Sequence, residues 1–256
     1  MTGLIRAELR KLAKRKLWWV MLAILVVVMG MAAVFLLVVP SRAPEAVPGM
    51  PVIRKPDAYI LGAQQAIGQT WFPIVLAAVA MGGEMRSAAF AASLVRDSRR
   101  WAHLLARLVV LAAASWLATL VAIGGWAIMA AAFAPGEGAP PSSEWLGMVW
   151  KSGLIVATWT ALAVAAVTVF RSLGPALGAA LVFSFVEGLV SLWEVYRPFS
   201  LSTNSTAMLG ELSGFDAGFG VSALGTIPPG RATAVVVVWA VGLIGLAWAA
   251  LQLRDA

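Results

Sequence analysis

The chain has 256 residues, of which 61% are apolar and 12% are charged, and its formal net charge is +7. Soluble domains average roughly 45–50% apolar and about 25% charged residues, so the composition excludes an ordinary soluble domain and favours several membrane spans. The absence of cysteine excludes disulfides and thiolate metal sites. The basic residues gather at the ends of apolar runs, which indicates membrane topology rather than a nucleic-acid interface.

Residues 1–16 hold six Lys and Arg residues, with Ile5, Leu9 and Leu12 at helical spacing. This pattern predicts a basic amphipathic helix that lies along the headgroups of the bilayer. A signal peptide is the competing interpretation. The apolar run that follows, residues 17–39, is 23 residues long, and the apolar core of a signal peptide spans only about 7–15 residues. We therefore expect a retained span.

The apolar runs predict an all-α polytopic membrane protein with six transmembrane helices in a single transmembrane domain, residues 1–256. The predicted spans are residues 17–39, 59–83, 104–134, 145–170, 173–193 and 231–251. Pro73 predicts a kink in the second span, and the third span is long enough to tilt or to extend beyond the bilayer. Five prolines in residues 40–56 predict an outer loop without regular structure. Arg171 and Ser172 form a tight inner turn.

Charge fixes the predicted orientation. With the N-terminus inside, thirteen of the nineteen Lys and Arg residues fall on the inner side and six on the outer side. Inner segments of membrane proteins carry such an excess. We therefore expect a multi-pass protein of the cytoplasmic (inner) membrane with both termini in the cytoplasm.

The most polar internal stretch is residues 82–107, which connects the second and third spans. Met85, Ala89, Ala92 and Val95 are spaced four, three and three residues apart, so they share one face of a helix. This spacing predicts a short amphipathic cytoplasmic helix over residues 85–96. Asp97 and Ser98 then form a plausible N-cap for the third span.

Two motifs link the chain to a known family. The basic start contains Glu8, Leu9, Lys11 and Leu12 ahead of the first span, and the connector contains Glu84 and Arg86, followed by Ser98, Arg99 and Arg107. The chain resembles the ABC-2-type transporter permeases, the membrane subunits of ABC exporters with the type V fold. It departs from their pattern at residues 88–90, where Ala-Ala-Phe replaces Gly-Thr-Leu, and at Asp97, which replaces a frequent proline.

The resemblance implies a permease that pairs with a second copy of itself or with a paralogous permease, and that docks two copies of a separate ABC ATPase. The predicted coupling residues are Glu84, Met85, Arg86, Ala89, Ala92, Val95, Arg96 and Arg99. Residues 194–230 resemble the extracytoplasmic re-entrant segment of this fold. The chain contains no GxxxxGK[ST] phosphate loop, so we expect no enzyme activity and no cofactor of its own, with ATP and Mg in the partner.

Candidate pathway residues are few. Glu187 is the one acid well inside a span, which makes it a functional hypothesis by default. Partnership with a loop residue and a carboxyl group that stays protonated are the structural alternatives. Gln65 and Gln69 either line the pathway or form hydrogen bonds between helices. His103 is predicted to be a surface residue rather than a metal ligand, and most of the twelve tryptophans lie at span ends, as in an aromatic belt.

Other functional classes of membrane protein stay open. A secondary transporter would show membrane acids or an inverted repeat, and a membrane enzyme would show a catalytic cluster. A sensor or assembly protein with the same fold is also consistent with the sequence. The substrate cannot be read from these residues.

Overall fold

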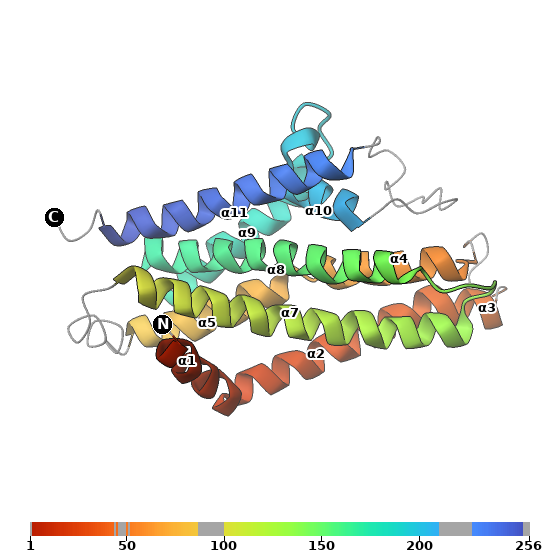
Figure 1. Cartoon of the computed structure of the whole chain (residues 1–256), viewed down its shortest axis with the longest axis horizontal. Helices are drawn as coiled ribbons and strands as arrows, with labels where there is room; N and C mark the ends of the chain where they lie inside the picture. The colour runs from red at the N-terminus through yellow and green to blue at the C-terminus, as the bar shows by residue number, and fades with distance from the viewer. Residues whose placement is uncertain are drawn as a thin grey trace.

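The computed structural model describes residues 2–43, 45, 50, 52–86, 100–209 and 227–252. Within these ranges the fold is an elongated bundle of α-helices without strands (Figure 1). Its helices are α1 Thr2–Lys14, α2 Lys16–Ala33, α3 Val39–Arg42, α4 Lys55–Gly68, α5 Trp71–Arg86, α7 Arg100–Phe133, α8 Ser142–Phe170, α9 Leu173–Val190, α10 Leu201–Leu209 and α11 Pro229–Gln252. The end of the bundle where α5 ends and α7 begins is called the connector end below.

The N-terminal helix α1 is separated from α2 by one extended residue, Arg15. Helix α1 turns back against α7, and Arg15 at its end contacts α5 (Figure 1). Within the predicted stretch 1–16, residues 2–14 form a helix, while its role as an amphipathic helix at a membrane surface stays a prediction. Its expected apolar face is only partly used: Leu12 is buried and Ile5 packs against the core, but Leu9 is 46% exposed.

The first long helix runs further than the sequence indicated. A π-helical turn, Val34–Val38, continues α2 into α3, so the helix extends to Arg42 and includes Pro40. The prediction that residues 40–56 have no regular structure is thus wrong at both ends, since α4 also begins at Lys55. The wider π turn gives room for the proline ring, which would clash with the preceding turn of a regular helix.

The second predicted span is two helices rather than one kinked helix. Helix α4 ends at Gly68 and α5 begins at Trp71. Pro73 explains the break, because its ring clashes with the carbonyl four residues earlier, at Gln69. At the start of α5 its missing N–H has no intrahelical partner to lose.

The middle of the bundle is the hairpin of α7 and α8. Helix α7 has 34 residues and is about 51 Å long at ~1.5 Å per residue, well beyond the ~30 Å of a hydrocarbon core. Helix α8 packs against α5, α7, α9 and α11 and is mostly buried, whereas α2, α9 and α11 are mostly exposed. Arg171, in the left-handed region at φ 51, ends α8 and makes the predicted tight turn into α9.

Two tryptophans fix the spacing of neighbouring helices. Trp126 of α7 is buried against Gly62 of α4, where any Cβ would overlap the indole ring, and its Nε1 donates to the carbonyl of Ala58 at 2.9 Å. Trp116 contacts Gly153 of α8 less closely, where a Cβ would lie 3.2 Å from the indole ring, and donates to the carbonyl of Val149 at 3.0 Å. These tryptophans pack inside the bundle and not in an aromatic belt.

The segment after α9 turns away from the bundle and returns as the short helix α10 (Figure 1). Helix α9 ends at Val190, three residues before the predicted end, and the corner that follows exposes apolar side chains, with Val195 88% exposed. Helix α10 is buried on the side of Leu201, Asn204 and Met208 and contacts α4, α8 and α11. Of the predicted outer segment 194–230, residues 210–226 lie outside the described ranges.

Candidate functional site

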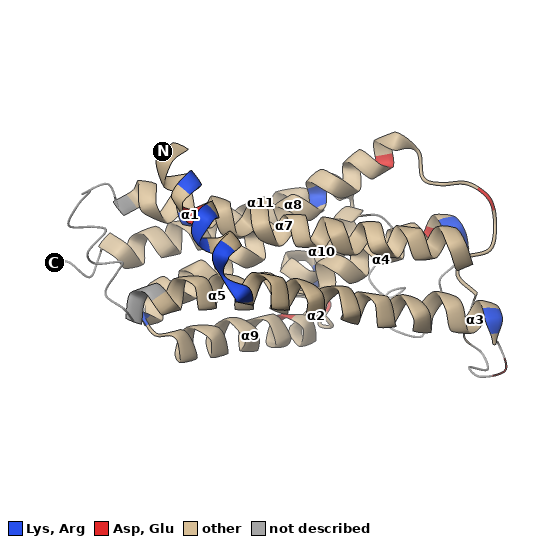
Figure 2. Ribbon diagram, turned by 90° about the horizontal axis from the view of Figure 1, so that it is seen from below, with Lys and Arg blue, Asp and Glu red and all other residues tan. Residues whose placement is uncertain are grey.

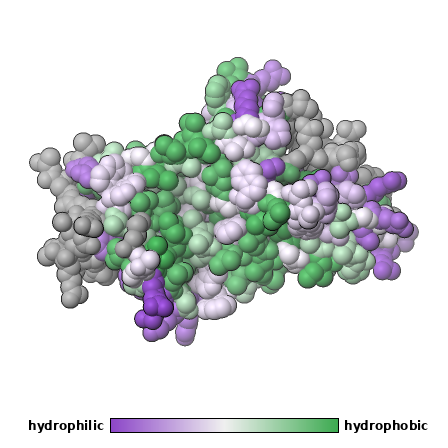
Figure 3. Space-filling view, in the orientation of Figure 1, coloured by the Kyte–Doolittle hydropathy of each residue, from purple (hydrophilic) through white to green (hydrophobic). Residues whose placement is uncertain are grey.

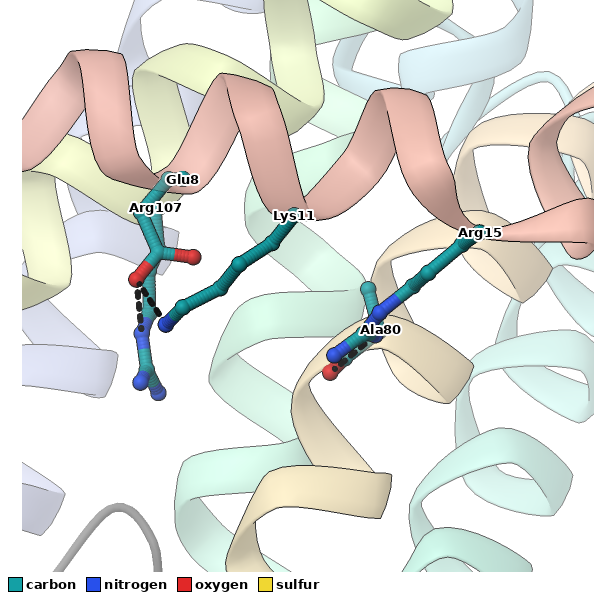
Figure 4. A network of polar contacts seen from close by, with 5 residues as sticks. All are labelled: Glu8, Lys11, Arg15, Ala80 and Arg107. Atoms are coloured by element: carbon teal, nitrogen blue, oxygen red, sulfur yellow. Dashed lines mark hydrogen bonds and ion pairs between the residues drawn. The ribbon is translucent and has the colours of Figure 1, made fainter.

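The connector end is held together by contacts from α1 (Figure 4). Glu8 accepts a hydrogen bond from Lys11 Nζ at 2.9 Å, and its Oε1 lies 3.6 Å from Nε of Arg107 on α7. Arg15 Nη1 donates to the carbonyl of Ala80 on α5 at 2.9 Å. These side chains border a small cavity of about 20 Å³. We call Glu8, Lys11, Arg15 and Arg107 the α1 clamp, because they join α1 and the residue that follows it to both helices that flank the connector.

Burial reduces the solvent screening of one contact in the clamp. Arg107 is only 3% exposed, so its contact with Glu8 is screened less than a surface ion pair. The Glu8–Lys11 pair is more exposed and contributes little. Sequence reasoning did not identify the pairing of Glu8 with Arg107. A signal was available, since Glu8 is the only acid among the first sixteen residues.

The prediction that His103 is a surface residue is wrong. Its exposed fraction is 8%. His103 lies one turn before Arg107 on α7, and residues four apart share a helix face. Arg107 on that face contacts Glu8 of α1, a contact that the connector sequence by itself could not reveal. Across the described residues, no group of three or more His, Asp or Glu side chains is placed to hold a metal ion.

The predicted coupling residues fall at the edge of the described structure. Helix α5 continues through Glu84 and Met85 to Arg86, so these three residues extend the second span into the connector. Ala89, Ala92, Val95, Arg96 and Arg99 lie outside the described residues. The helix predicted over residues 85–96 and the N-cap at Asp97 and Ser98 therefore stay predictions. Helix α7 begins directly afterwards, at Arg100.

Basic side chains mark the connector end. Figure 2 shows the Lys and Arg residues of α1 crossing the bundle beside the ends of α5 and α7. A further basic group lies at the opposite end, on α3. Between these ends, the surface in Figure 3 is predominantly hydrophobic. The pattern is that of a protein whose middle contacts lipid.

The polar residues of the second span gather at the break between α4 and α5. Gln69 Nε2 donates to the carbonyl of Gln65 at 3.3 Å, and its Oε1 accepts from Trp71 Nε1 at 2.8 Å. The hydroxyls of Thr70 and Ser184 share a hydrogen bond of 2.7 Å, which links this break to α9. These contacts support the interpretation that the polar residues connect helices. A pathway role for Gln65 and Gln69 stays a prediction.

Glu187 lies at the end of α9 and is 3% exposed. Its Oε1 accepts from the hydroxyl of Ser200 at 2.7 Å, and its two oxygens accept from the backbone N–H of Ser202 at 3.2 and 3.1 Å. Ser200 in turn accepts from the N–H of Thr203 at 3.1 Å. Both N–H groups belong to the first turn of α10, where a negative charge is favourable.

Glu187 therefore acts as a capping group for α10, and this accounts for a buried acid without a transport role. The pKa of Tyr196, in the corner between the helices, is raised above its usual 10.0 by burial and by the charge of Glu187. Trp239 of α11 also donates to the carbonyl of Phe199 at 3.0 Å, so the corner is fixed from two sides.

Six helical segments of the described structure are long and apolar enough to cross a membrane. Together with the hydrophobic middle and the polar ends, they define a multi-pass, all-α membrane protein. Neither a family model nor a curated protein matches the chain.

Proposed function

We propose that this chain is the membrane-spanning permease subunit of an ATP-driven ABC-2-type exporter. Two permease chains, identical or paralogous, form the substrate pathway together. A separate ABC ATPase supplies the nucleotide chemistry and docks on residues 84–99. Both termini and the connector face the cytoplasm, on the side of the inner membrane where ATP is available.

The α1 clamp is the observation that carries the proposal. A permease without its own ATPase must receive force through a cytoplasmic element and pass it to its spans. The clamp joins α1 to α7 through Glu8 and Arg107, and Arg15, which directly follows α1, joins this segment to α5; α5 and α7 border the connector. A force on the connector is then shared among three helices, and α7 passes it along its full length to α8. Discrete packed elements of this kind can carry coupling between distant sites.

The opposite end supplies a candidate gate. Helix α10 is short and buried and is capped by Glu187 of α9. Non-regular backbone at membrane depth, such as the turn that leads into α10, must be shielded by protein or line a cavity. In the proposed cycle, α10 closes the outer end of the pathway, and movement of α9 relative to α8 changes that closure.

Co-purification with hydrolysis tests this function. The tagged chain, isolated in mild detergent from the cells that produce it naturally, is expected to retain an ATPase chain with a GxxxxGK[ST] loop. Hydrolysis by the complex should disappear when the loop lysine of that ATPase is replaced by alanine. A chain that is isolated intact but never retains an ATPase, in detergent or in reconstituted vesicles, would contradict the proposal.

A further inference from the structure

A cavity of about 370 Å³ lies at the end of the bundle opposite the connector. The first turns of α8 lean away from the other helices there (Figure 2). The cavity is lined by α8 residues, by Ile60 of α4 and by Leu209 of α10. Its volume falls within the roughly 300–1,000 Å³ typical of small-molecule sites.

Two opposite charges line this cavity on one face of α8. Glu144 and Lys151 are seven residues apart, which corresponds to two turns and about 10.5 Å along the axis. Within the described part of the chain, neither side chain forms an ion pair or a hydrogen bond. Lys151 is partly buried, and a charge removed from water is costly without a partner. The cavity therefore fits a ligand with one anionic and one cationic group.

The depth of the two charges indicates what that ligand is. Lys151 lies nineteen residues before Phe170, the end of α8, which is about 28 Å along the helix. A hydrocarbon core is about 30 Å thick, and the headgroups lie beyond it. If Phe170 marks one boundary of the core, Lys151 lies at the other boundary, and Glu144 lies within the headgroup layer. In a phospholipid the phosphate likewise lies nearer the core than the amine. Lys151 is therefore at the depth of the phosphate, and Glu144 is at the depth of the amine.

We propose that this cavity binds a phosphoethanolamine headgroup of a membrane lipid. Lys151 donates hydrogen bonds to the phosphate, Glu144 accepts from the ammonium, and Ile60, Met148 and Leu209 pack against the carbon atoms of the headgroup. A primary ammonium has three N–H donors, whereas the quaternary ammonium of choline has none. The site therefore prefers ethanolamine over choline. The proposal does not depend on the ATPase or on transport.

Binding of dioleoyl lipids to the purified full chain, measured by native mass spectrometry from a non-ionic detergent, tests the site. We expect one phosphatidylethanolamine per chain, bound more tightly than phosphatidylcholine or phosphatidylglycerol. Lys151→Gln should weaken this binding by about tenfold, the effect of one charge-assisted hydrogen bond. Lys151→Arg should retain most of it. Glu144→Gln should remove the preference for ethanolamine over choline.

Lys55→Gln is the matched control, because Lys55 lies at the same end of the bundle on α4 and does not line the cavity. Soluble phosphoethanolamine should compete only at far higher concentration, because it lacks the apolar part. Equal competition would assign the site to a free anion and contradict a lipid ligand. The proposal would be overturned if phosphatidylethanolamine bound equally well to wild type, Lys151→Gln and Glu144→Gln. A preference for phosphatidylglycerol would also overturn it.

Discussion

Replacement of Glu187 by Gln tests whether this buried acid is a cap or a pathway residue. The carboxylate accepts from one hydroxyl and one backbone N–H, using both oxygens. Glutamine keeps one oxygen and turns an NH₂ group toward these donors, so at least one charge-assisted hydrogen bond is lost. Such a bond is worth about 1.5–3 kcal/mol.

Removal of the acid also has a favourable term. An acid within a span costs about 2.5–3.5 kcal/mol on insertion scales. That penalty applies to a residue facing lipid, and Glu187 is buried and hydrogen-bonded. We therefore expect net destabilisation, corresponding to a fall of about 3–12 °C in the midpoint of thermal unfolding.

The assay is thermal unfolding in detergent, combined with transport per folded molecule in vesicles. Glu194→Gln is the control, because Glu194 is exposed in the adjacent corner. A cap predicts a lower midpoint for Glu187→Gln only, with transport per folded molecule unchanged. An unchanged midpoint would refute the capping argument. Reduced transport at an unchanged midpoint would favour the pathway interpretation.

Three further predictions address orientation and packing. In this cysteine-free chain, a cysteine at Ser142 should react with an impermeant maleimide from outside intact cells and one at Ser172 should not; the reverse result would invert the topology. Gly62→Ala should destabilise the fold by about 1–3 kcal/mol, because the new Cβ overlaps the buried ring of Trp126, whereas Gly124→Ala, where no atom is within 4 Å, should be neutral or stabilising in the same thermal assay. Glu8→Gln should cost about 2 kcal/mol by removing the carboxylate beside buried Arg107, measured against Glu137→Gln in an exposed loop; equal midpoints would show that the α1 clamp contributes nothing.

Long apolar runs predicted the fold class well. Each of the six spans corresponds to helix, because about twenty apolar residues leave few alternatives in lipid. The ends of the helices were predicted less accurately, because they depend on local backbone geometry. The helix passes Pro40 because a π turn precedes it, and the break at Gln69 lies one turn before the proline that causes it.

Contacts between distant segments could not be predicted in the same way. Two contacts join residues that are far apart in sequence: Glu8 pairs with Arg107, and Trp126 packs on Gly62. The burial of His103 also depends on how the helices pack. No periodicity within one helix encodes such pairs. The role of Glu187 could be predicted in part. Its depth in a span marked it as unusual, and a loop partner was one of the interpretations. Its partners Ser200 and Ser202 could be identified only from the structure.

Docking of the ATPase on the connector is the central claim. Ala89→Asp and Ala92→Asp would place a carboxylate on the predicted apolar face, and a fully desolvated unpaired charge costs about 3–5 kcal/mol. A micromolar contact is worth about 8 kcal/mol, so the complex should be lost on purification. Ser93→Asp, off that face by the same periodicity, is the control. The decisive measurement is retention of the co-expressed ATPase by each purified variant. We predict that both alanine variants insert normally and lose the ATPase while Ser93→Asp retains it; normal insertion with full retention and full hydrolysis in all three would contradict the claim.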